Sequence, residues 1–195
     1  MILYLASGSP RRRELLDQLG IPFTVVKSTY EEHNEQYESP YELVEQQALG
    51  KALAAVLPTE AKGNAHTVLG ADTIVVHKGH KLGKPHDVEG AKMMLGELAG
   101  DYHEVVTGVA LCHYDSNGDL LGQSVFHVCT KVYFFDLTEA DIEAYVATGE
   151  PMDKAGAYGI QGKGAYLVKG IEGSYTNVVG LPIEVVARKL KEGSR

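Results

Sequence analysis

ILYLASGSPRRRELL, residues 2–16, decides the fold class because it joins the pattern of a buried strand to the pattern of a helix. The continuous apolar run over residues 2–6 is typical of a buried strand. Ser9 can cap a following helix, Pro10 suits the first turn, and Gly20 can end it. The stretch therefore predicts the opening strand and helix of a mixed α/β chain.

The rest of the chain continues this alternation of apolar runs and helical patterns. Strands are expected at residues 23–26, 67–76, 105–113, 123–135 and 165–169. Helices are expected at residues 31–57, 88–98, 138–148 and 182–190, and the acids at 31, 35, 38, 42 and 45 would mark the solvent face of the first of these. The turn residues 115–118 predict a hairpin between the two strands that flank them. Thr138 with Asp141 resembles a capping box.

Length and composition limit the class of protein. The chain has 195 residues, which suits one domain, with two small lobes as an option. The sequence contains 18 Lys and Arg against 26 Asp and Glu, a formal net charge of −8, which argues against a partner that is duplex nucleic acid. A small anionic ligand is still compatible, because its site needs only local positive charge.

Localisation is predicted from hydropathy and from the two cysteines. No apolar run is long enough to cross a bilayer, so no membrane association is expected, and the opening residues lack the pattern of a signal peptide. Cys112 and Cys129 lie in different apolar segments and are expected to be reduced, mostly buried thiols. We therefore expect a cytoplasmic protein.

Three arginines crowd the predicted start of the first helix. The N-terminus of a helix carries partial positive charge, so cations are normally disfavoured there. Placing Arg11, Arg12 and Arg13 at this point is reasonable if an anion binds, and the hydroxyls of Ser7 and Ser9 can add donors. An exposed basic turn that pairs with nearby acids is the alternative.

Asp72 lies in the middle of the predicted strand 67–76. Burying a carboxylate costs several kcal/mol unless it is paired, hydrogen-bonded or bound to metal. A divalent ion could compensate the charge, and the carboxylate could then orient or deprotonate an attacking water. Alternatively, Asp72 lies at a strand end and caps a turn with Thr73.

The remaining polar candidates are weak when each is taken alone. Lys51 and Lys84 could reach the same ligand, but lone lysines are usually solvated. Glu31 and Glu32 could complete a shell of oxygen ligands around Mg²⁺ or Mn²⁺, although they also begin a run of acids typical of a solvated face. Gln161, in a glycine-rich segment, could bind a base edge through its amide, or the segment could be an ordinary loop.

Five strings, taken together, resemble the Maf family of nucleotide pyrophosphatases. They are LASGSPRRRELL at 5–16, GADTIVV at 70–76, LGKP at 82–85, GEPMDKAGAYGIQG at 149–162 and GSYTNVVGLP at 173–182. They span about the whole chain in family order. The resemblance implies a single Maf-like domain over residues 1–195, with a long twisted mixed sheet, flanking helices and two lobes around a cleft, similar to the inosine triphosphatase fold. It also implies hydrolysis of a nucleoside triphosphate to the monophosphate and pyrophosphate, with Mg²⁺ or Mn²⁺.

The resemblance assigns roles to individual residues. Asp72 matches the proton acceptor and, together with Glu32, a position that holds metal. Glu31 and Glu35 are the alternatives to Glu32 as the acidic ligand of the ion. The other matched positions are Arg11, Thr73 and Gln161, linked to substrate choice, and Ser7, Arg12, Lys51 and Lys84, which line the phosphate site.

Arg11, Thr73 and Gln161 side with the branch of the family that acts on dTTP and UTP. The branch acting on 7-methyl-GTP usually has a bulkier residue in place of Arg11 and Gln in place of Thr73, and lacks the AGAYGIQG string. Arg13 departs from many relatives. The alternatives are 7-methyl-GTP hydrolysis and a nucleotide-binding regulator of septum formation without essential catalysis. Clearance of modified pyrimidine nucleotides, a link to cell division arrest and a homodimer are further expectations from the resemblance.

Overall fold

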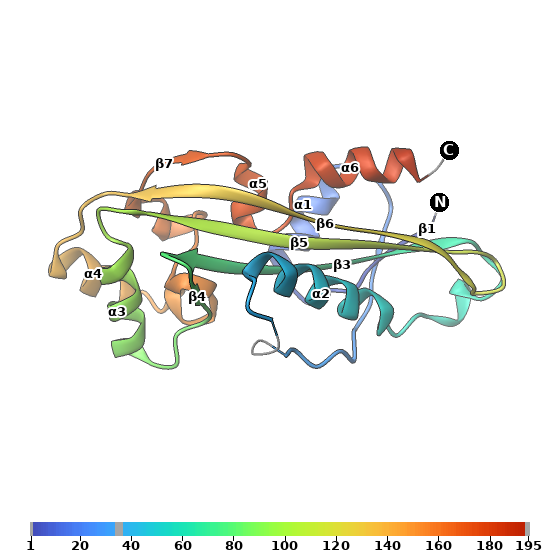
Figure 1. The fold of residues 1–195 in the computed structure, drawn as a ribbon, viewed down its shortest axis with the longest axis horizontal. Coiled ribbons are helices and arrows are strands. Elements are labelled where there is room, and N and C mark those ends of the chain that lie inside the picture. Colours follow the sequence, from blue (N-terminus) through green and yellow to red (C-terminus); the bar gives the residue numbers. More distant parts are fainter. Residues whose placement is uncertain (1, 34–36, 194–195) are drawn as a thin grey trace. The chain divides into compact units, whose positions relative to one another are not determined.

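The computed structural model describes residues 2–33 and 37–193 and shows a mixed α/β fold, as predicted (Figure 1). Its strands are β1 (Ile2–Leu5), β2 (Thr24–Val25), β3 (His66–His77), β4 (His80–Leu82), β5 (Tyr102–Tyr114), β6 (Leu120–Phe134) and β7 (Val168–Glu172). Its α-helices are α1 (Pro10–Asp17), α2 (Pro40–Leu53), α3 (Val88–Leu98), α4 (Glu139–Val146), α5 (Tyr175–Val179) and α6 (Ile183–Glu192). Short 3₁₀ helices are η1 (Thr59–Ala61), η2 (Glu150–Asp153), η3 (Ala155–Ala157) and η4 (Gly162–Leu167).

In the described part of the chain the strands form one seven-stranded mixed sheet in the order β2-β1-β3-β5-β6-β7, with β4 also paired to β3. β1 is parallel to both β2 and β3, whereas β4 is antiparallel to β3 and β7 is antiparallel to β6. The long mixed sheet with flanking helices confirms the predicted fold class.

The chain divides into two compact units. The first consists of Met1–Asp72, Thr107–Val128 and Gly180–Arg195, and the second of Thr73–Val106 and Cys129–Val179. Strands β3, β5 and β6 each contribute residues to both units. Asp72 is therefore the last residue of β3 that belongs to the first unit.

In the first unit, helix α2 packs directly on the sheet through two glycines. A Cβ atom on Gly70 of β3 would collide with the carbonyl oxygen of Ala48, and one on Gly108 of β5 would collide with that of Val44. Any larger residue would push the helix away from the strands. This close approach places α2 beside the segment of β3 that contains Asp72.

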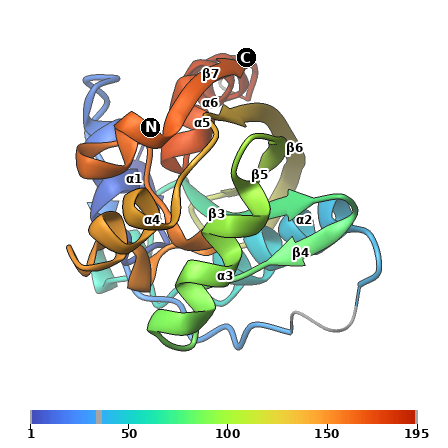
Figure 2. The same ribbon diagram turned by 90° about the vertical axis from the view of Figure 1, so that its left-hand side faces the viewer.

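The second unit has its own hydrophobic core. Helices α3 and α4 lie side by side, as Figures 1 and 2 show. The fully buried residues of this core come from α3, α4, the strands and the glycine-rich segment. They include Leu95, Leu98, Val132, Tyr145, Ala157 and Leu167. The glycine-rich segment is therefore packed into this unit on one side.

Several predicted helix boundaries are confirmed. The Oγ atom of Ser9 accepts a hydrogen bond from the amide of Arg12 at 3.4 Å, with Pro10 in the first turn of α1. Thr138 and Asp141 form the capping box of α4, each side chain accepting from the other's amide. Helix α3 spans the predicted residues, and the turn at 115–118 joins β5 to β6.

The predicted helix over residues 31–57 is wrong at both ends. Helix α2 begins at Pro40, capped by Ser39, and ends at Leu53. Proline disfavours helical backbone in the residue before it, so the helix cannot extend toward Glu31 through this point. Glu31 lies in irregular backbone, and Glu35 falls outside the described residues. The acids at 31–45 therefore do not form one helical face.

Two further predictions need correction. The strand expected at 165–169 begins only at Val168, because residues 162–167 form η4, whose first residue, Gly162, has φ 68°. Cys112 is buried, but Cys129 is exposed, because its position on β6 points away from the core. Both are free thiols.

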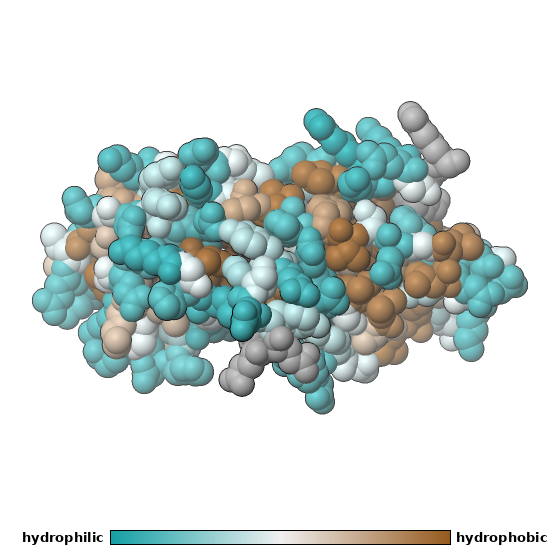
Figure 3. All heavy atoms as spheres, in the orientation of Figure 1, coloured by the Kyte–Doolittle hydropathy of each residue, from teal (hydrophilic) through white to brown (hydrophobic). Residues whose placement is uncertain are grey.

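The surface is largely hydrophilic on the face shown in Figure 3, with apolar side chains among the polar ones. In residues 2–33 and 37–193, no helix has both the length and the apolar character needed to span a membrane.

Candidate active site

The loop between β1 and α1 is organised by its two serines. The amide of Ser9 donates to Ser7 Oγ at 3.2 Å, and Ser9 Oγ in turn caps α1. The first turn of α1 contains no acidic residue, so no carboxylate of that turn offsets the positive end of the helix. The positive end of the helix is therefore compatible with the predicted anion site.

Arg12 is the arginine of this turn that the fold fixes in place. Its Nε atom donates to the carbonyl oxygen of Gly180 at 2.8 Å, and Nη1 donates to Ser7 Oγ at 3.4 Å. Burial lowers its pKa, while the negative charge of Asp72 acts in the opposite direction. Arginine nevertheless stays protonated in proteins. Arg12 is thus a half-buried cation close to Asp72. It is also close to Arg11, and the charge of Arg11 further lowers the pKa of Arg12.

Lys51 joins two carboxylates. Its Nζ atom lies 2.7 Å from Oδ1 of Asp72 and 2.7 Å from Oε1 of Glu32. The Lys51 and Asp72 side chains are 16% and 15% exposed, so their charges are largely removed from water, whereas Glu32 is 49% exposed. The ammonium group compensates the carboxylate of Asp72 for the water it has lost.

Asp72 is an interior strand residue and does not cap a turn. It is residue seven of the twelve in β3, and its neighbours in that strand are mostly buried. The alternative interpretation, a turn cap at a strand end, is therefore wrong. The cost of placing a carboxylate there is offset by Lys51.

The segment before α2 brings Glu32 to Lys51. The amide of Thr29 donates to Ala54 O at 3.0 Å, which ties this segment to the end of α2. The ring of Tyr30 covers Gly50, where a Cβ atom would collide with it. Sequence reasoning missed Tyr30 and Gly180 as supports of the site. Gly50, next to the candidate Lys51, was the sequence signal that could have pointed to Tyr30.

The predicted site residues fall into two sets. The first unit brings together Ser7, Arg11, Arg12, Glu32, Lys51 and Asp72. Thr73, Lys84 and Gln161 belong to the second unit. Thr73 follows Asp72 directly in β3 and is half-buried, whereas Lys84, after β4, and Gln161, before η4, are exposed. Glu31 is exposed as well.

The residues present fit a divalent ion only in part. Among residues 2–33 and 37–193 no three His, Cys, Asp or Glu side chains form a cluster that could hold a metal. Oxygen atoms of Glu32 and Asp72 do converge on one cationic centre, the Nζ atom of Lys51. Two carboxylates suit Mg²⁺, which usually takes its other ligands from water and substrate phosphates.

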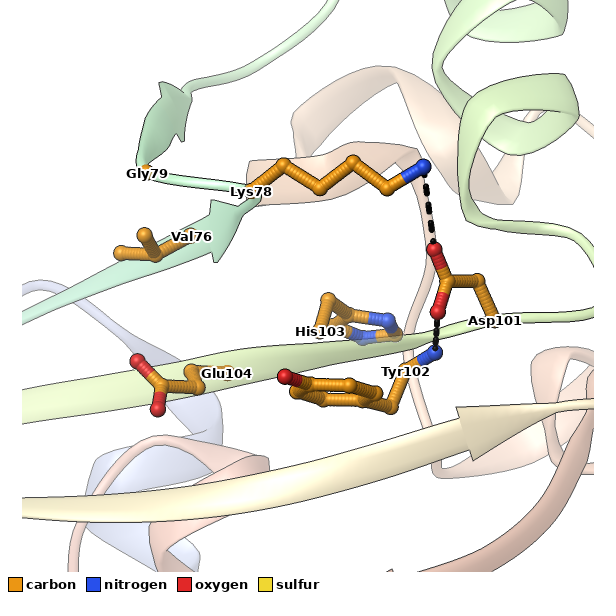
Figure 4. A pocket seen from close by; sticks show the side chains of 7 residues that line it. All are labelled: Val76, Lys78, Gly79, Asp101, Tyr102, His103 and Glu104. Carbon is orange, nitrogen blue, oxygen red and sulfur yellow. Dashed lines mark hydrogen bonds and ion pairs between the residues drawn. The ribbon is translucent and has the colours of Figure 1, made fainter.

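A separate cavity of about 240 Å³ lies in the second unit (Figure 4). It is lined by Val76, Lys78, Gly79, Asp101, Tyr102, His103 and Glu104. Asp101 is already engaged, because it lies 3.3 Å from Lys78 Nζ and accepts the amide of Tyr102. The cavity contains none of the predicted site residues and is smaller than most small-molecule sites.

Comparison with known proteins identifies a family for this chain. The family model described as "Maf-like protein" matches residues 2–193. A protein of Bacillus cereus (strain AH820) named "dTTP/UTP pyrophosphatase" is 49% identical over 191 residues, 97% of this chain and 94% of the relative. One of the same name from Halalkalibacterium halodurans is 50% identical over 190 residues, again 97% and 94%.

A solved structure, a nucleoside-triphosphatase described as a dITP/XTP pyrophosphatase from Mycobacterium abscessus, is also similar. It has a TM-score of 0.39 and 16% sequence identity, and the match covers 100% of this chain and 94% of that one. The family model and the curated relatives span nearly the whole chain, and they show that the chain belongs to the Maf family.

Proposed function

We propose that this protein hydrolyses dTTP and UTP to the nucleoside monophosphate and pyrophosphate. The observation that carries the proposal is the ion-paired carboxylate of Asp72, held inside a strand at 2.7 Å from Lys51 and close to the cation Arg12. A carboxylate in such a place is costly to bury, which favours a chemical role for it. The names of relatives about half identical over nearly the whole chain support the substrate assignment.

Asp72 acts as the general base in this proposal. It takes a proton from water, whose oxygen then attacks the α-phosphorus. The bond between that phosphorus and the oxygen bridging to the β-phosphate breaks, and pyrophosphate leaves with the electron pair. A positioned base of this kind contributes typically ~10²–10⁴-fold to the rate.

Cations at the start of α1 neutralise the phosphates. Arg12, held by Gly180 and Ser7, presents donors that match phosphate oxygens, and the amides at the start of α1 add positive potential. Ser7, Lys51 and Lys84 contribute further donors. These groups stabilise the charge that develops on the leaving pyrophosphate.

A divalent ion would be held by Glu32 and Asp72 together with phosphate oxygens. When bound, Mg²⁺ or Mn²⁺ supplies charge stabilisation to the phosphates. Lys51 then has to move aside or share the carboxylates, because its ammonium group lies at their point of convergence.

Recognition of the pyrimidine base is assigned to Gln161, Thr73 and Arg11. A base of another size or pattern would cover these polar groups and leave them unpaired, which is how hydrogen-bonding sites reject analogues. This assignment favours dTTP and UTP over 7-methyl-GTP.

The experiment that tests the function measures pyrophosphate and phosphate released from dTTP, UTP, CTP, dATP, GTP and 7-methyl-GTP, with Mg²⁺ or Mn²⁺. We expect pyrophosphate from dTTP and UTP, and its loss in Asp72→Asn. Turnover of 7-methyl-GTP alone would contradict the substrate assignment and keep the reaction type. Tight nucleotide binding without turnover would favour a regulator over an enzyme.

A further inference from the structure

The segment that carries Gln161 is tied at both ends to one pair of side chains. The hydroxyl of Tyr145, on α4, donates to Glu150 Oε1 at 2.9 Å and accepts the amide of Gly159 at 3.2 Å. Glu150 Oε1 also accepts the amide of Gly164 at 3.1 Å, and Oε2 accepts that of Lys163 at 3.2 Å. Glu150 and Tyr145 therefore hold the backbone on either side of Gln161.

The two ends of this segment also touch each other. A Cβ atom on Gly164 would collide with the carbonyl oxygen of Gly159 and lie 2.8 Å from the Tyr145 hydroxyl. On the outer side, a Cβ atom on Gly159 would lie 2.7 Å from Cε of Lys154, whose Nζ donates to Glu150 O at 3.0 Å. Residues 159–164 thus form a closed loop, which we call the Gln161 loop.

The pair that holds this loop is more buried than the loop itself. Tyr145 is 1% exposed and belongs to the core of the second unit, and Glu150 is half-buried, whereas Gln161 is exposed. Burial raises the pKa of Tyr145, so its hydroxyl stays protonated and donates to the carboxylate. A charged acceptor with three donors gives strong hydrogen bonds, which restrict the loop more than neutral contacts would.

A restricted loop matters for a glutamine that recognises a pyrimidine. The amide offers a donor and an acceptor side by side, and uracil or thymine presents the complementary acceptor and donor. Cytosine presents its exocyclic amine as a donor instead of that acceptor. Turned over about its last side-chain bond, the same amide would match cytosine, so discrimination requires that the loop hold the Gln161 side chain in the orientation that matches uracil.

We propose that Glu150, supported by Tyr145, is a positioning residue that fixes the Gln161 loop and thereby sets selectivity for uracil and thymine over cytosine. The inference rests on the proposed function and deepens it. Neither residue touches the nucleotide in this proposal, because both act through the backbone of the loop.

The test compares Glu150→Gln with the matched control Glu172→Gln. Glu150→Gln keeps the shape of the side chain but replaces one acceptor oxygen by an NH2 group, which is a donor. That group would face a donor from which the wild-type carboxylate accepts a hydrogen bond. Glu172 on β7 also accepts from a tyrosine, Tyr133 at 3.2 Å, and lies outside the Gln161 loop. We expect Glu150→Gln to lower the ratio of kcat/KM for UTP over CTP by about tenfold, mainly through a higher KM for UTP. The control should keep the ratio.

Two further readouts separate positioning from a general structural role. In a Gln161→Ala background, Glu150→Gln should leave the UTP to CTP ratio nearly unchanged, because the residue through which it acts is gone. Tyr145→Phe, which keeps the ring in the core, should lower the ratio in the same direction by a smaller factor. Amide hydrogen exchange at Lys163 and Gly164 should become faster in Glu150→Gln.

A folded Glu150→Gln enzyme whose UTP to CTP ratio stays within about twofold of wild type would overturn the inference. An additive loss in the Gln161→Ala background would also overturn it. If the wild-type protein releases no pyrophosphate from UTP, the proposed function fails first and the inference falls with it. That result is seen before any variant is compared, so the two failures are distinguishable.

Discussion

The two units hold their polar groups in different ways. In the first unit, side chains on regular elements contact one another: Lys51 on α2 reaches Asp72 on β3, and both are fixed by the packing of the helix on the sheet. In the second unit, Glu150 and Tyr145 hold backbone amides of a segment that has only short 3₁₀ turns.

This difference separates substitutions into two kinds. Regular elements keep their geometry when one side chain changes. A substitution among Arg12, Glu32, Lys51 and Asp72, which we call the first cluster, should therefore alter charge and chemistry in an unchanged fold. An irregular loop has no such support, and loss of its ties alters where the backbone lies. Substitutions in the two units should therefore differ in what they change.

The largest expected effect is that of Asp72→Asn. The amide keeps the size of the side chain but cannot accept a proton from water, so kcat for dTTP should fall about 10³-fold. Pyrophosphate release at saturating dTTP measures it. Asp17→Asn, at the exposed end of α1, is the matched control and should retain activity. Activity close to wild type in Asp72→Asn would remove the basis for treating the first cluster as the chemical one.

Arg12→Lys should have the next largest effect. Lysine retains the charge but cannot donate to Gly180 O and Ser7 Oγ in the same way while facing phosphate, so KM for dTTP should rise about 10–100-fold. Steady-state kinetics at several dTTP concentrations measure this rise. Arg13, the neighbouring arginine, is exposed, and Arg13→Lys should leave KM nearly unchanged. Equal effects of the two substitutions would mean that the fold does not single out Arg12.

The sequence predicts the first cluster better than it predicts the Gln161 loop and the side chains that hold it. Asp72 stands out because a carboxylate in an apolar run needs compensation, and the arginines stand out against the helix dipole. These signals depend on local composition, which a sequence shows directly. The strand and helix patterns likewise predict the mixed fold, including α3 and the capping box at Thr138.

What the sequence could not show are contacts between distant residues and the ends of irregular segments. The partner of Arg12 is a backbone carbonyl at Gly180, and any residue type would offer one. The helix expected from Glu31 begins only at Pro40, because periodic acids indicate a solvent face without proving a helix. Glu150 ties a loop through backbone amides, which leave no trace in composition.

Lys51→Met tests how far the stability of the protein depends on the ammonium group of Lys51 in the first cluster. The substitution leaves Asp72 and Glu32 facing each other without the ammonium group, so the free energy of unfolding should fall by about 1–3 kcal/mol. Urea denaturation at neutral pH measures the loss, with the exposed Lys27→Met as control. Mg²⁺ should restore part of the loss if it binds the two carboxylates in place of the ammonium. An unchanged midpoint would show that the ion pair is energetically neutral.

His103, in the second unit, should change the stability in a way that depends on pH. It is 1% exposed, its Nε2 atom lies 2.6 Å from the Tyr158 hydroxyl, and burial lowers its pKa to about 3. Between about pH 6.5 and pH 4 the unfolded chain binds a proton at this residue and the folded protein does not. The free energy of unfolding should therefore decrease as the pH falls through this range, by up to about 1.4 kcal/mol per pH unit from this residue.

His103→Asn should remove this contribution, so the difference between wild type and variant is the quantity to measure. The substitution also removes packing, but that loss is an offset independent of pH, whereas the titration appears as a slope. The measurement uses the range from about pH 6.5 to 4.5 to avoid the titration of Asp101. A hydrogen bond with His77 lowers the pKa of Asp101 to about 2. The stability that Asp101 contributes is therefore lost only as the pH falls below about 4. Equal slopes in the two proteins would mean that His103 takes up its proton in the folded state, and the contrast between an ionic first cluster and a neutral buried pair in the second unit would fail.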